Sequence, residues 1–434
     1  MHRLLFIFLL IFGKFIECIG QPASISNCGL KLGKDVPDGL KLVWHDEFNE
    51  GRLDTNQWST QYYSTWDFID KTNYEAFKEN NLPMPAMFFT DSTLVLYTNE
   101  LSPEKAYWPS GRKISSIQTY DWNRDTCLSA NFVGGYIEAR IRRNASKDAK
   151  MVNGAFWLDS PGPDLKYFIE KGNRAFDVEG IRPSGQVFEI DLCEYLNTEI
   201  VLHGNVAADG TFKKNIGHHI VPGDFQNKWI THGMLWTPAG LKFYIDGKLV
   251  KEWWDPSDIK SPNHMMNLYL GIYAKGGKAS MEVDYIRFYQ WDLEKNNELP
   301  NGDFEYGNSL FPWEGSAGIE KEKVVSGKQG VSIAPGDSIY QLVYLDHTQN
   351  YNVHFQACNT GNLKIRVENL KPVSSKVVGY FDAIYNIKPV FESFTLPFKT
   401  ENDYKGHKTT VKVILINNSK QNIIVDQVMI KKRT

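Results

Sequence analysis

Residues 281–289, Met-Glu-Val-Asp-Tyr-Ile-Arg-Phe-Tyr, alternate apolar and polar side chains with a period of two. Residues 133–141, Val-Gly-Gly-Tyr-Ile-Glu-Ala-Arg-Ile, repeat this alternation. Successive side chains of a strand point to opposite faces, so both stretches predict half-buried strands. From about residue 42 to residue 291, similar short segments are separated by turn residues, and no stretch has the length and capping of a convincing helix. This region therefore predicts an all-β sandwich.

A hairpin is the firmest local prediction within this sandwich. Residues 242–245, Lys-Phe-Tyr-Ile, are followed by Asp246-Gly247 and then by residues 248–250, Lys-Leu-Val. An Asp-Gly pair readily adopts the positive φ angles of a tight two-residue turn. The two flanking runs should pair as neighbouring antiparallel strands.

The chain has 434 residues, which is long for one domain and sufficient for two. Residues 293–303 are polar, contain Pro and Gly, and separate two regions of apolar alternation, so we expect a linker there. Residues 21–292 would form the first domain, and residues 304–434 a second, smaller β-sandwich.

The first 20 residues resemble an export signal. Arg3 precedes an apolar run from Leu4 to Phe12, and Gly20 offers a small residue at a cleavage point. The apolar run is too short to span a membrane and Lys14 follows it closely. We expect a secreted, periplasmic or surface protein without a transmembrane segment, with a lipid anchor at Cys18 as the less favoured alternative.

Charge and cysteine content limit the function classes. The 48 Lys and Arg residues against 51 Asp and Glu residues give a net charge of -3, which predicts no nucleic-acid partner. The mature chain would hold Cys28, Cys127, Cys193 and Cys358 without a CxxC pair or a zinc-binding spacing. One disulfide, such as Cys28 with Cys127, is an open alternative. We expect a monomer with no cofactor for catalysis.

Three acids interrupt an otherwise apolar strand at residues 187–195, Val-Phe-Glu-Ile-Asp-Leu-Cys-Glu-Tyr. In a regular strand, Glu189 and Asp191 share one face and Glu194 points to the other. One β-bulge near Leu192-Cys193 would add a residue and return Glu194 to the common face. The two Glu Cα atoms would then lie roughly 13 Å apart, at about 3.3 Å per residue. Their side chains would leave a gap of about 5 Å, the separation of a retaining glycosidase pair.

Charge repulsion suggests the roles of these acids. Three carboxylates on one face cannot all ionise easily, so at least one keeps a proton near neutral pH, as a general acid requires. Asp191 lies between the other two and could modulate the nucleophile. Spacing alone does not say whether Glu189 or Glu194 is the nucleophile. For an isolated E-x-D motif, acids on a solvated edge strand or at a calcium site would be the favoured explanation.

The wider context resembles glycoside hydrolase family 16, the group of laminarinases, lichenases, agarases and carrageenases. The resemblance extends over about residues 42–291 and rests on signatures in a fixed order: residues 42–49, 135–140, 155–158, the E-x-D-x-x-E of residues 189–194, 232–238 followed by 243–247, and 283–289. It implies a concanavalin-like β-jelly-roll with an open cleft.

The resemblance also assigns roles to residues. Glu189 would be the nucleophile, Asp191 the assisting acid and Glu194 the acid/base. Trp157 would stack on a sugar, and Asp284 would help hold a structural calcium ion. The implied activity is a secreted, retaining endo-β-glycosidase that acts on a β-linked polysaccharide. A non-catalytic glycan-binding protein and a transglycosylase are the alternatives on the same fold.

Other candidate substrate contacts follow from position. His203 could contact the sugar beyond the cleavage point, or could be a buried, hydrogen-bonded histidine. Trp108 and Trp122 lie in segments that should border the cleft, and of the adjacent Trp253 and Trp254 at most one can point into it. Loop arginines could meet sulfate groups or simply be solvated: Arg112, Arg124, Arg174 and Arg182.

Two departures from the family pattern affect the expected substrate. Asn205 and Ala207 stand where many β-1,3-glucanases carry histidines, and residues 164–186 form an irregular insertion. Laminarin is therefore in doubt, and galactans, mixed-linkage glucans and host glycans stay open.

The second domain resembles a carbohydrate-binding module from about residue 299 onward. Its candidate binding platform consists of Trp313, Tyr340 and Tyr344. A structural appendage without sugar affinity is the alternative for this domain.

Overall fold

The structure is a computed structural model of the chain. It describes the residues 32–61, 83–104, 111–121, 124, 126–129, 133–160, 187–204, 216–255, 259, 261–371, 376–401 and 408–433. Every regular element in these ranges is a β-strand, so the predicted all-β class is confirmed. Within the same ranges, no helix has the length and apolar character needed to cross a membrane.

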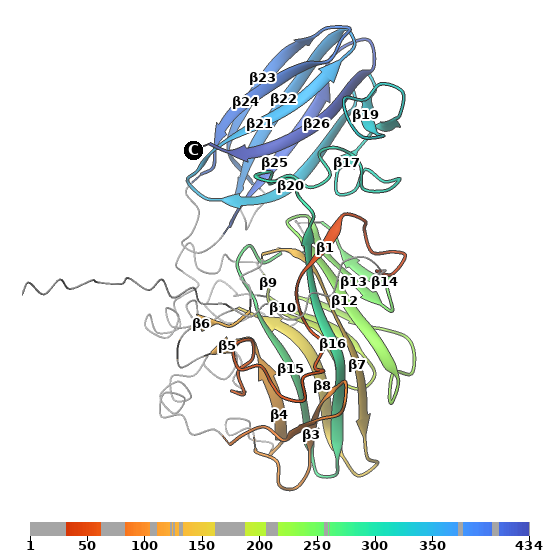
Figure 1. Cartoon of the computed structure of the whole chain (residues 1–434), viewed down its shortest axis with the longest axis vertical. Coiled ribbons are helices and arrows are strands. Elements are labelled where there is room, and N and C mark those ends of the chain that lie inside the picture. Colours follow the sequence, from red (N-terminus) through yellow and green to blue (C-terminus); the bar gives the residue numbers. More distant parts are fainter. Residues whose placement is uncertain are drawn as a thin grey trace, which may run out of the picture. The chain divides into compact units, whose positions relative to one another are not determined.

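The first sandwich has two large sheets (Figure 1). The eight-stranded sheet contains, in order, β14 (Lys248–Trp253), β13 (Gly240–Ile245), β12 (Trp229–Thr237), β7 (Gly135–Ala145), β16 (Ala279–Trp291), β3 (Leu94–Thr98) and β2 (Met87–Phe89), with β1 (Leu40–Asp46) also paired to β16. The six-stranded sheet contains β11 (Gly217–Ile220), β10 (Glu199–Gly204), β9 (Val187–Glu194), β8 (Lys150–Asp159), β15 (Asn267–Lys275) and β4 (Lys113–Gln118). A short ribbon pairs β5 (Tyr120–Asp121) with β6 (Thr126–Cys127).

The strands predicted from the clearest alternation lie next to one another. β7 and β16 are antiparallel neighbours, with Ile137 opposite Phe288 and Tyr136 opposite Tyr289. Ile137 and Phe288 enter the core between the two sheets, while Tyr136 and Tyr289 belong to a separate cluster. The period-two pattern therefore separates two differently packed faces. In β7, however, both faces are buried from Gly135 to Ala139, because a second cluster covers the face of Tyr136, so this strand is not half-buried as predicted.

The predicted hairpin is also present. β13 and β14 pair across the Asp246-Gly247 turn, where the φ angles are +48° and +70°. Both angles lie in the left-handed region that a tight hairpin turn requires, which explains the Asp-Gly pair at this position.

The second sandwich consists of two five-stranded sheets with a core of their own. One contains β17 (Glu314–Gly315), β20 (Ser338–Asp346), β25 (Lys408–Asn417), β22 (Gly361–Lys371) and β23 (Lys376–Ile387). The other contains β18 (Gly318–Glu320), β19 (Gly330–Ile333), β26 (Ile423–Lys432), β21 (Asn350–Cys358) and β24 (Glu392–Lys399). The fold class, a jelly-roll sandwich followed by a smaller sandwich, is thus as predicted. The boundaries of the domains, 21–292 and 304–434, stay a prediction.

Two expectations need correction. Trp313 is buried in the core of the second sandwich, where its indole donates to the Asn301 carbonyl, so it cannot form part of a surface platform. Cys127 is a free thiol whose Sγ lies 3.3 Å from Ser129 Oγ, so it does not form the suggested disulfide. The predicted partner Cys28, the signal at residues 1–20 and Cys18 all lie outside the described residues.

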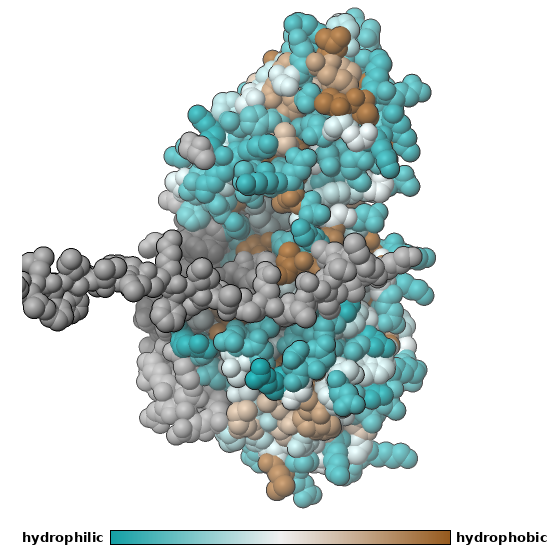
Figure 2. Space-filling model, in the orientation of Figure 1, coloured by the Kyte–Doolittle hydropathy of each residue, from teal (hydrophilic) through white to brown (hydrophobic). Residues whose placement is uncertain are grey.

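Tyr340 and Tyr344 alternate with buried residues along β20 and are half-buried. The Lys412 ammonium lies 3.8 Å from the centre of the Tyr340 ring. The face of the molecule in Figure 2 is largely hydrophilic, with apolar residues gathered at one end of the second sandwich. The exposed large apolar side chains of β23 are Val377, Val378, Tyr380 and Ile384.

Candidate active site

The predicted bulge in β9 is present. Against β8, Cys193 is opposite Phe156 but Asp191 is opposite Trp157, so one residue of β9 has no partner. Against β10, Glu194 is opposite Glu199 and Asp191 is opposite Val201, so three steps along β9 match two steps along its neighbour. Both neighbours thus locate the extra residue between Asp191 and Glu194.

The bulge sorts the side chains of β9 into two groups. Ile190, Leu192 and Cys193 enter the core between the sheets. Glu189 and Asp191 alternate with them and therefore point to the outer face of the six-stranded sheet. Beyond the extra residue, Glu194 returns to this outer face, so all three acids share it.

Burial and mutual repulsion perturb the pKa values of these acids. Desolvation, followed by the charge of Asp191, raises the pKa of Glu189 well above its usual value. Desolvation, followed by the charge of Glu194, does the same for the pKa of Asp191. The pKa of Glu194 is also raised, mainly by desolvation, although a hydrogen bond from Asn153 opposes the shift. A group of acids that resists full ionisation can keep a proton for general acid catalysis.

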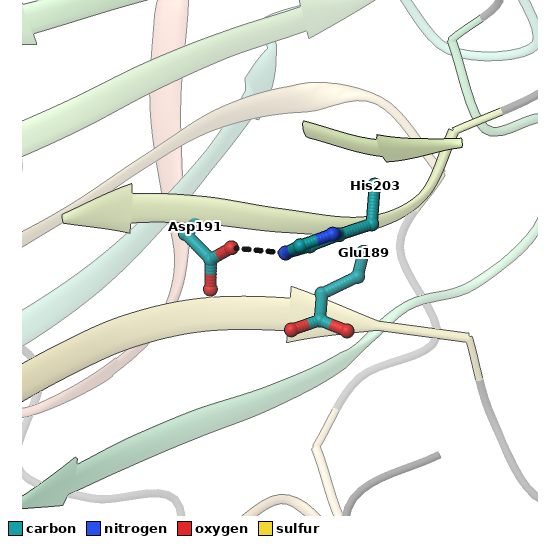
Figure 3. A group of neighbouring side chains, drawn as sticks. All are labelled: Glu189, Asp191 and His203. Atoms are coloured by element: carbon teal, nitrogen blue, oxygen red, sulfur yellow. Dashed lines mark ion pairs between the residues drawn. The ribbon is translucent and has the colours of Figure 1, made fainter. Parts of the chain in front are cut away.

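His203 approaches this group from β10. It is opposite Glu189 in the strand register, and its Nε2 lies 3.4 Å from Asp191 Oδ2. Figure 3 shows the imidazole directed at the Asp191 carboxylate, with Glu189 beside it. One potential ligand atom from each of Glu189, Asp191 and His203 lies within 4.8 Å of the others.

Asn153 holds the third acid. This side chain of β8 donates from Nδ2 to Glu194 Oε1 at 2.7 Å and accepts from the Tyr195 backbone N–H at 2.9 Å. The first bond stabilises the ionised form of Glu194, and the second fixes the backbone that follows β9. Asn153 thereby orients Glu194 and opposes the larger effect of desolvation on the pKa of its carboxyl.

The turn after β9 is held from inside the sandwich. Arg143 of β7 is 2% exposed and donates to the carbonyls of Gly154 and Tyr195 and to Thr198 Oγ1. Tyr195 and Thr198 both have a φ of +56°, a conformation that residues other than Gly rarely adopt. The buried guanidinium of Arg143 binds this turn and compensates for its backbone strain. It thereby positions β9, which leads into the turn, and β10, which follows it.

Trp157 lies on the same outer face as the acids. Its ring stacks on Tyr269 of β15 with centroids 4.7 Å apart and planes 8° apart, in a cluster that also contains Ile114, Ala155 and Tyr273. The indole is only 4% exposed. The predicted sugar-stacking role of Trp157 stays a prediction.

Two further carboxylates on this face were not predicted. Asp159 of β8 is fully buried and opposite Glu189, and its charge raises the pKa of both Glu189 and Asp191 after the larger effects named above. Glu199 of β10 is opposite Glu194. Neither forms a motif with the three acids in sequence, because pairing between strands brings them together.

Other predicted contacts lie elsewhere or are not described. Arg124 is exposed and pairs with Asp121 at 2.5 Å. Trp253 packs edge-on against Phe243 of the eight-stranded sheet, and Trp254 belongs to a cluster on that sheet, so neither side chain lies on the face with the acids. Trp108, Trp122, Arg174, Arg182, Asn205, Ala207 and the insertion at residues 164–186 lie outside the described residues.

The surroundings of the Asp284 carboxylate do not suit the expected role as a calcium ligand. It accepts a hydrogen bond from Arg140 Nη1 at 2.5 Å, so a guanidinium occupies the position beside it. A cation would have to displace this partner. Calcium at Asp284 stays a prediction, and no step of the chemistry depends on it.

Comparison with known proteins identifies the domain that carries this site. Residues 174–289, which include β9 with its three acids, match the family described as glycosyl hydrolases family 16. The chain contains a family 16 domain. The predicted resemblance is confirmed at this level.

Relatives of the family 16 domain have named activities on different polysaccharides. The chain is 23% identical over 286 residues to glucan endo-1,3-beta-glucosidase A1 of Niallia circulans (58% of this chain, 38% of the relative). It is 24% identical over 303 residues to keratan-sulfate endo-1,4-beta-galactosidase of Sphingobacterium multivorum (63% and 59%). It is 22% identical over 438 residues to kappa-carrageenase of Pseudoalteromonas carrageenovora (92% and 95%).

The chain thus spans 38% and 59% of the length of the first two relatives. Among solved structures, a GlcNAcα1-4Gal-releasing endo-β-galactosidase of Clostridium perfringens is 19% identical and covers 87% of this chain and 97% of its own, with a TM-score of 0.41. At that score the likeness adds nothing to the fold of the family 16 domain described above.

Proposed function

We propose that this protein is a secreted, retaining endo-β-glycosidase that hydrolyses a β-linked glucan or galactan by double displacement. The observation that carries the proposal is the β9 bulge, because it brings Glu194 to the same face as Glu189 and Asp191. Family 16 membership and the activities named for the relatives support a β-polysaccharide as the substrate.

In the first step, Glu189 attacks the anomeric carbon while Glu194 gives its proton to the departing glycosidic oxygen. In the second step, Glu194 removes a proton from water, which attacks the glycosyl ester and releases the sugar with retained configuration. Asp191 lies between them on β9, with its Oδ2 atom 3.4 Å from His203 Nε2, so its carboxyl can adjust the basicity of Glu189 as the ester forms and breaks.

The assignment of Glu189 as nucleophile over Glu194 follows two observations. Glu189 is 6% exposed, whereas Glu194 is half-buried and accepts a hydrogen bond from Asn153. An acid/base must meet both the leaving oxygen and water, which suits the more accessible residue.

The test is product formation by the mature protein on a panel of polysaccharides, measured by reducing ends. The panel contains a β-1,3-glucan, a mixed-linkage β-glucan, agarose, κ-carrageenan and keratan sulfate. We expect turnover of at least one of them, with oligosaccharide products that retain the β configuration by NMR. Glu189→Gln should reduce kcat by at least ~10⁴-fold while substrate binding persists, since it removes the nucleophile and changes little volume.

A matched control is Glu252→Gln, at a half-exposed residue of β14 that pairs with Lys242 at 3.2 Å on the other sheet. The Glu252→Gln variant should have the same turnover as the unaltered protein. Near-normal turnover by Glu189→Gln would contradict the assignment of the nucleophile. Binding without any cleavage by the unaltered protein would favour a glycan-binding protein, and transfer of sugar to an added acceptor in place of water would favour a transglycosylase.

A further inference from the structure

A fourth carboxylate lies directly across from the acid/base. Glu199 of β10 is opposite Glu194 of β9 in the strand register. Ile200 and Leu202 of β10 enter the core, so Glu199 alternates with them onto the outer face that carries Glu194. Residues opposite each other on antiparallel strands have Cβ atoms about 4.5–5.5 Å apart, and like charges at such positions repel. Ionisation of Glu194 is therefore disfavoured by a neighbour that is separate from the catalytic motif.

Glu199 is held in place by two side chains. The Nε2 atom of His218 in β11 lies 2.7 Å from Glu199 Oε2, and Asn197 Nδ2 donates to Glu199 Oε1 at 3.0 Å. The side chain of Glu199 is 18% exposed and that of His218 is 43% exposed. Contacts at both oxygens orient the carboxylate. Glu199 is thus built into the sheet as a fixed acid.

Two neighbours have opposite effects on the proton of Glu194. Desolvation raises the pKa of Glu194 most, the hydrogen bond from Asn153 lowers it, and the charge of Glu199 raises it. The titratable and charged groups that face Glu194 come from its own strand, from β10 and from the residues beside them: Glu189, Asp191, Tyr195, Glu199, His203 and Arg112.

We propose that Glu199 is a positioning residue that keeps the proton on Glu194 until the glycosidic bond breaks. The proposal rests on the function proposed above. The charge of Glu189 is lost when the glycosyl ester forms, and this change lets Glu194 become a base for the second step. Glu199 neither gains nor loses a bond in either step. Its charge would therefore raise the proton affinity of Glu194 by the same amount throughout the cycle.

The experiment compares the pH dependence of kcat/KM for Glu199→Gln and Glu199→Asp, using the polysaccharide that the unaltered protein cleaves. The basic limb of this profile reports the free enzyme's acid. Loss of the charge should move the basic limb of Glu199→Gln to lower pH by roughly 0.5–1 unit. Glu199→Asp keeps the charge and should leave that limb within roughly 0.3 unit. Glu199→Ala, a second neutral variant, should shift it in the same direction as Glu199→Gln.

A second measurement separates proton delivery from general damage. An aryl glycoside with a good leaving group needs little acid assistance, so Glu199→Gln should slow its cleavage much less than cleavage of the polysaccharide above neutral pH. Equal losses on both substrates, or a basic limb that does not move in either neutral variant, would overturn the role of Glu199. If the unaltered protein cleaves nothing in the panel, the proposed function itself fails, which is a distinguishable result.

Discussion

Replacement of Asn153 by Ala offers a sharp test of how Glu194, the proposed acid/base, is held. The variant loses the hydrogen bond to Glu194 Oε1 at 2.7 Å and the one from the Tyr195 N–H at 2.9 Å. A hydrogen bond to a charged group contributes about 1.5–3 kcal/mol, which corresponds to roughly 1–2 pKa units. The lost bond stabilised the ionised form, so the pKa of Glu194 should rise.

The expected result for Asn153→Ala is a basic limb of kcat/KM that moves to higher pH by roughly one unit, since neighbouring water replaces part of the lost bond. This direction is opposite to that expected for Glu199→Gln. The freed backbone N–H should also lower the free energy of unfolding by about 1 kcal/mol, measured by urea denaturation.

The matched control is Asn369→Ala. Asn369 is fully buried in the second sandwich and donates to the Lys399 carbonyl at 3.0 Å. It should destabilise the protein without moving the pH profile. A basic limb that stays fixed in Asn153→Ala, or moves to lower pH, would refute the view that this amide controls the proton of Glu194.

Two further predictions concern stability. Arg143→Met should lower the free energy of unfolding by about 2–4 kcal/mol, because the strained turn at Tyr195 and Thr198 loses a buried donor. A free energy of unfolding equal to that of the unaltered protein would contradict this role. The second prediction concerns Glu47, which accepts a hydrogen bond from Arg287 at 2.7 Å. Desolvation would raise the pKa of Glu47. Hydrogen bonds with His45 and Arg287 outweigh this effect, so the pKa of Glu47 is lowered. The pair's stabilisation, about 1 kcal/mol, should be present at neutral pH and lost as the pH falls through the lowered pKa of Glu47. A double-mutant cycle of Glu47→Gln and Arg287→Met at pH 7 and pH 3 measures it, and equal coupling at both values would count against the assignment.

Much of the site could be predicted from one stretch of sequence. The order of acids and apolar residues at 187–195 is compatible with a buried strand only if one residue is extra, and the registers against β8 and β10 confirm that bulge. The alternation of β7 and β16 and the Asp246-Gly247 turn were equally predictable, because period and turn chemistry are local properties.

The partners of the acids could not be predicted in the same way. Asn153, Glu199 and Arg143 come from β8, β10 and β7, and nothing in their local sequence indicates that they meet Glu194 or the turn after it. Alternation tells which residues share a face, but not which strands pair or in what register. Trp313 illustrates the same limit, since an aromatic ring suits a binding surface and a β-sandwich core equally well, and here it lies in the core.

The sequence by itself determined the strands, the tight hairpin turn and a motif of three acids that requires a bulge, because these depend on side-chain period and on the φ angles that particular residues accept. Only the tertiary structure decided how strongly each acid holds its proton. That property depends on burial and on charges carried by neighbouring strands, whose effect falls with distance in space and not with separation along the chain.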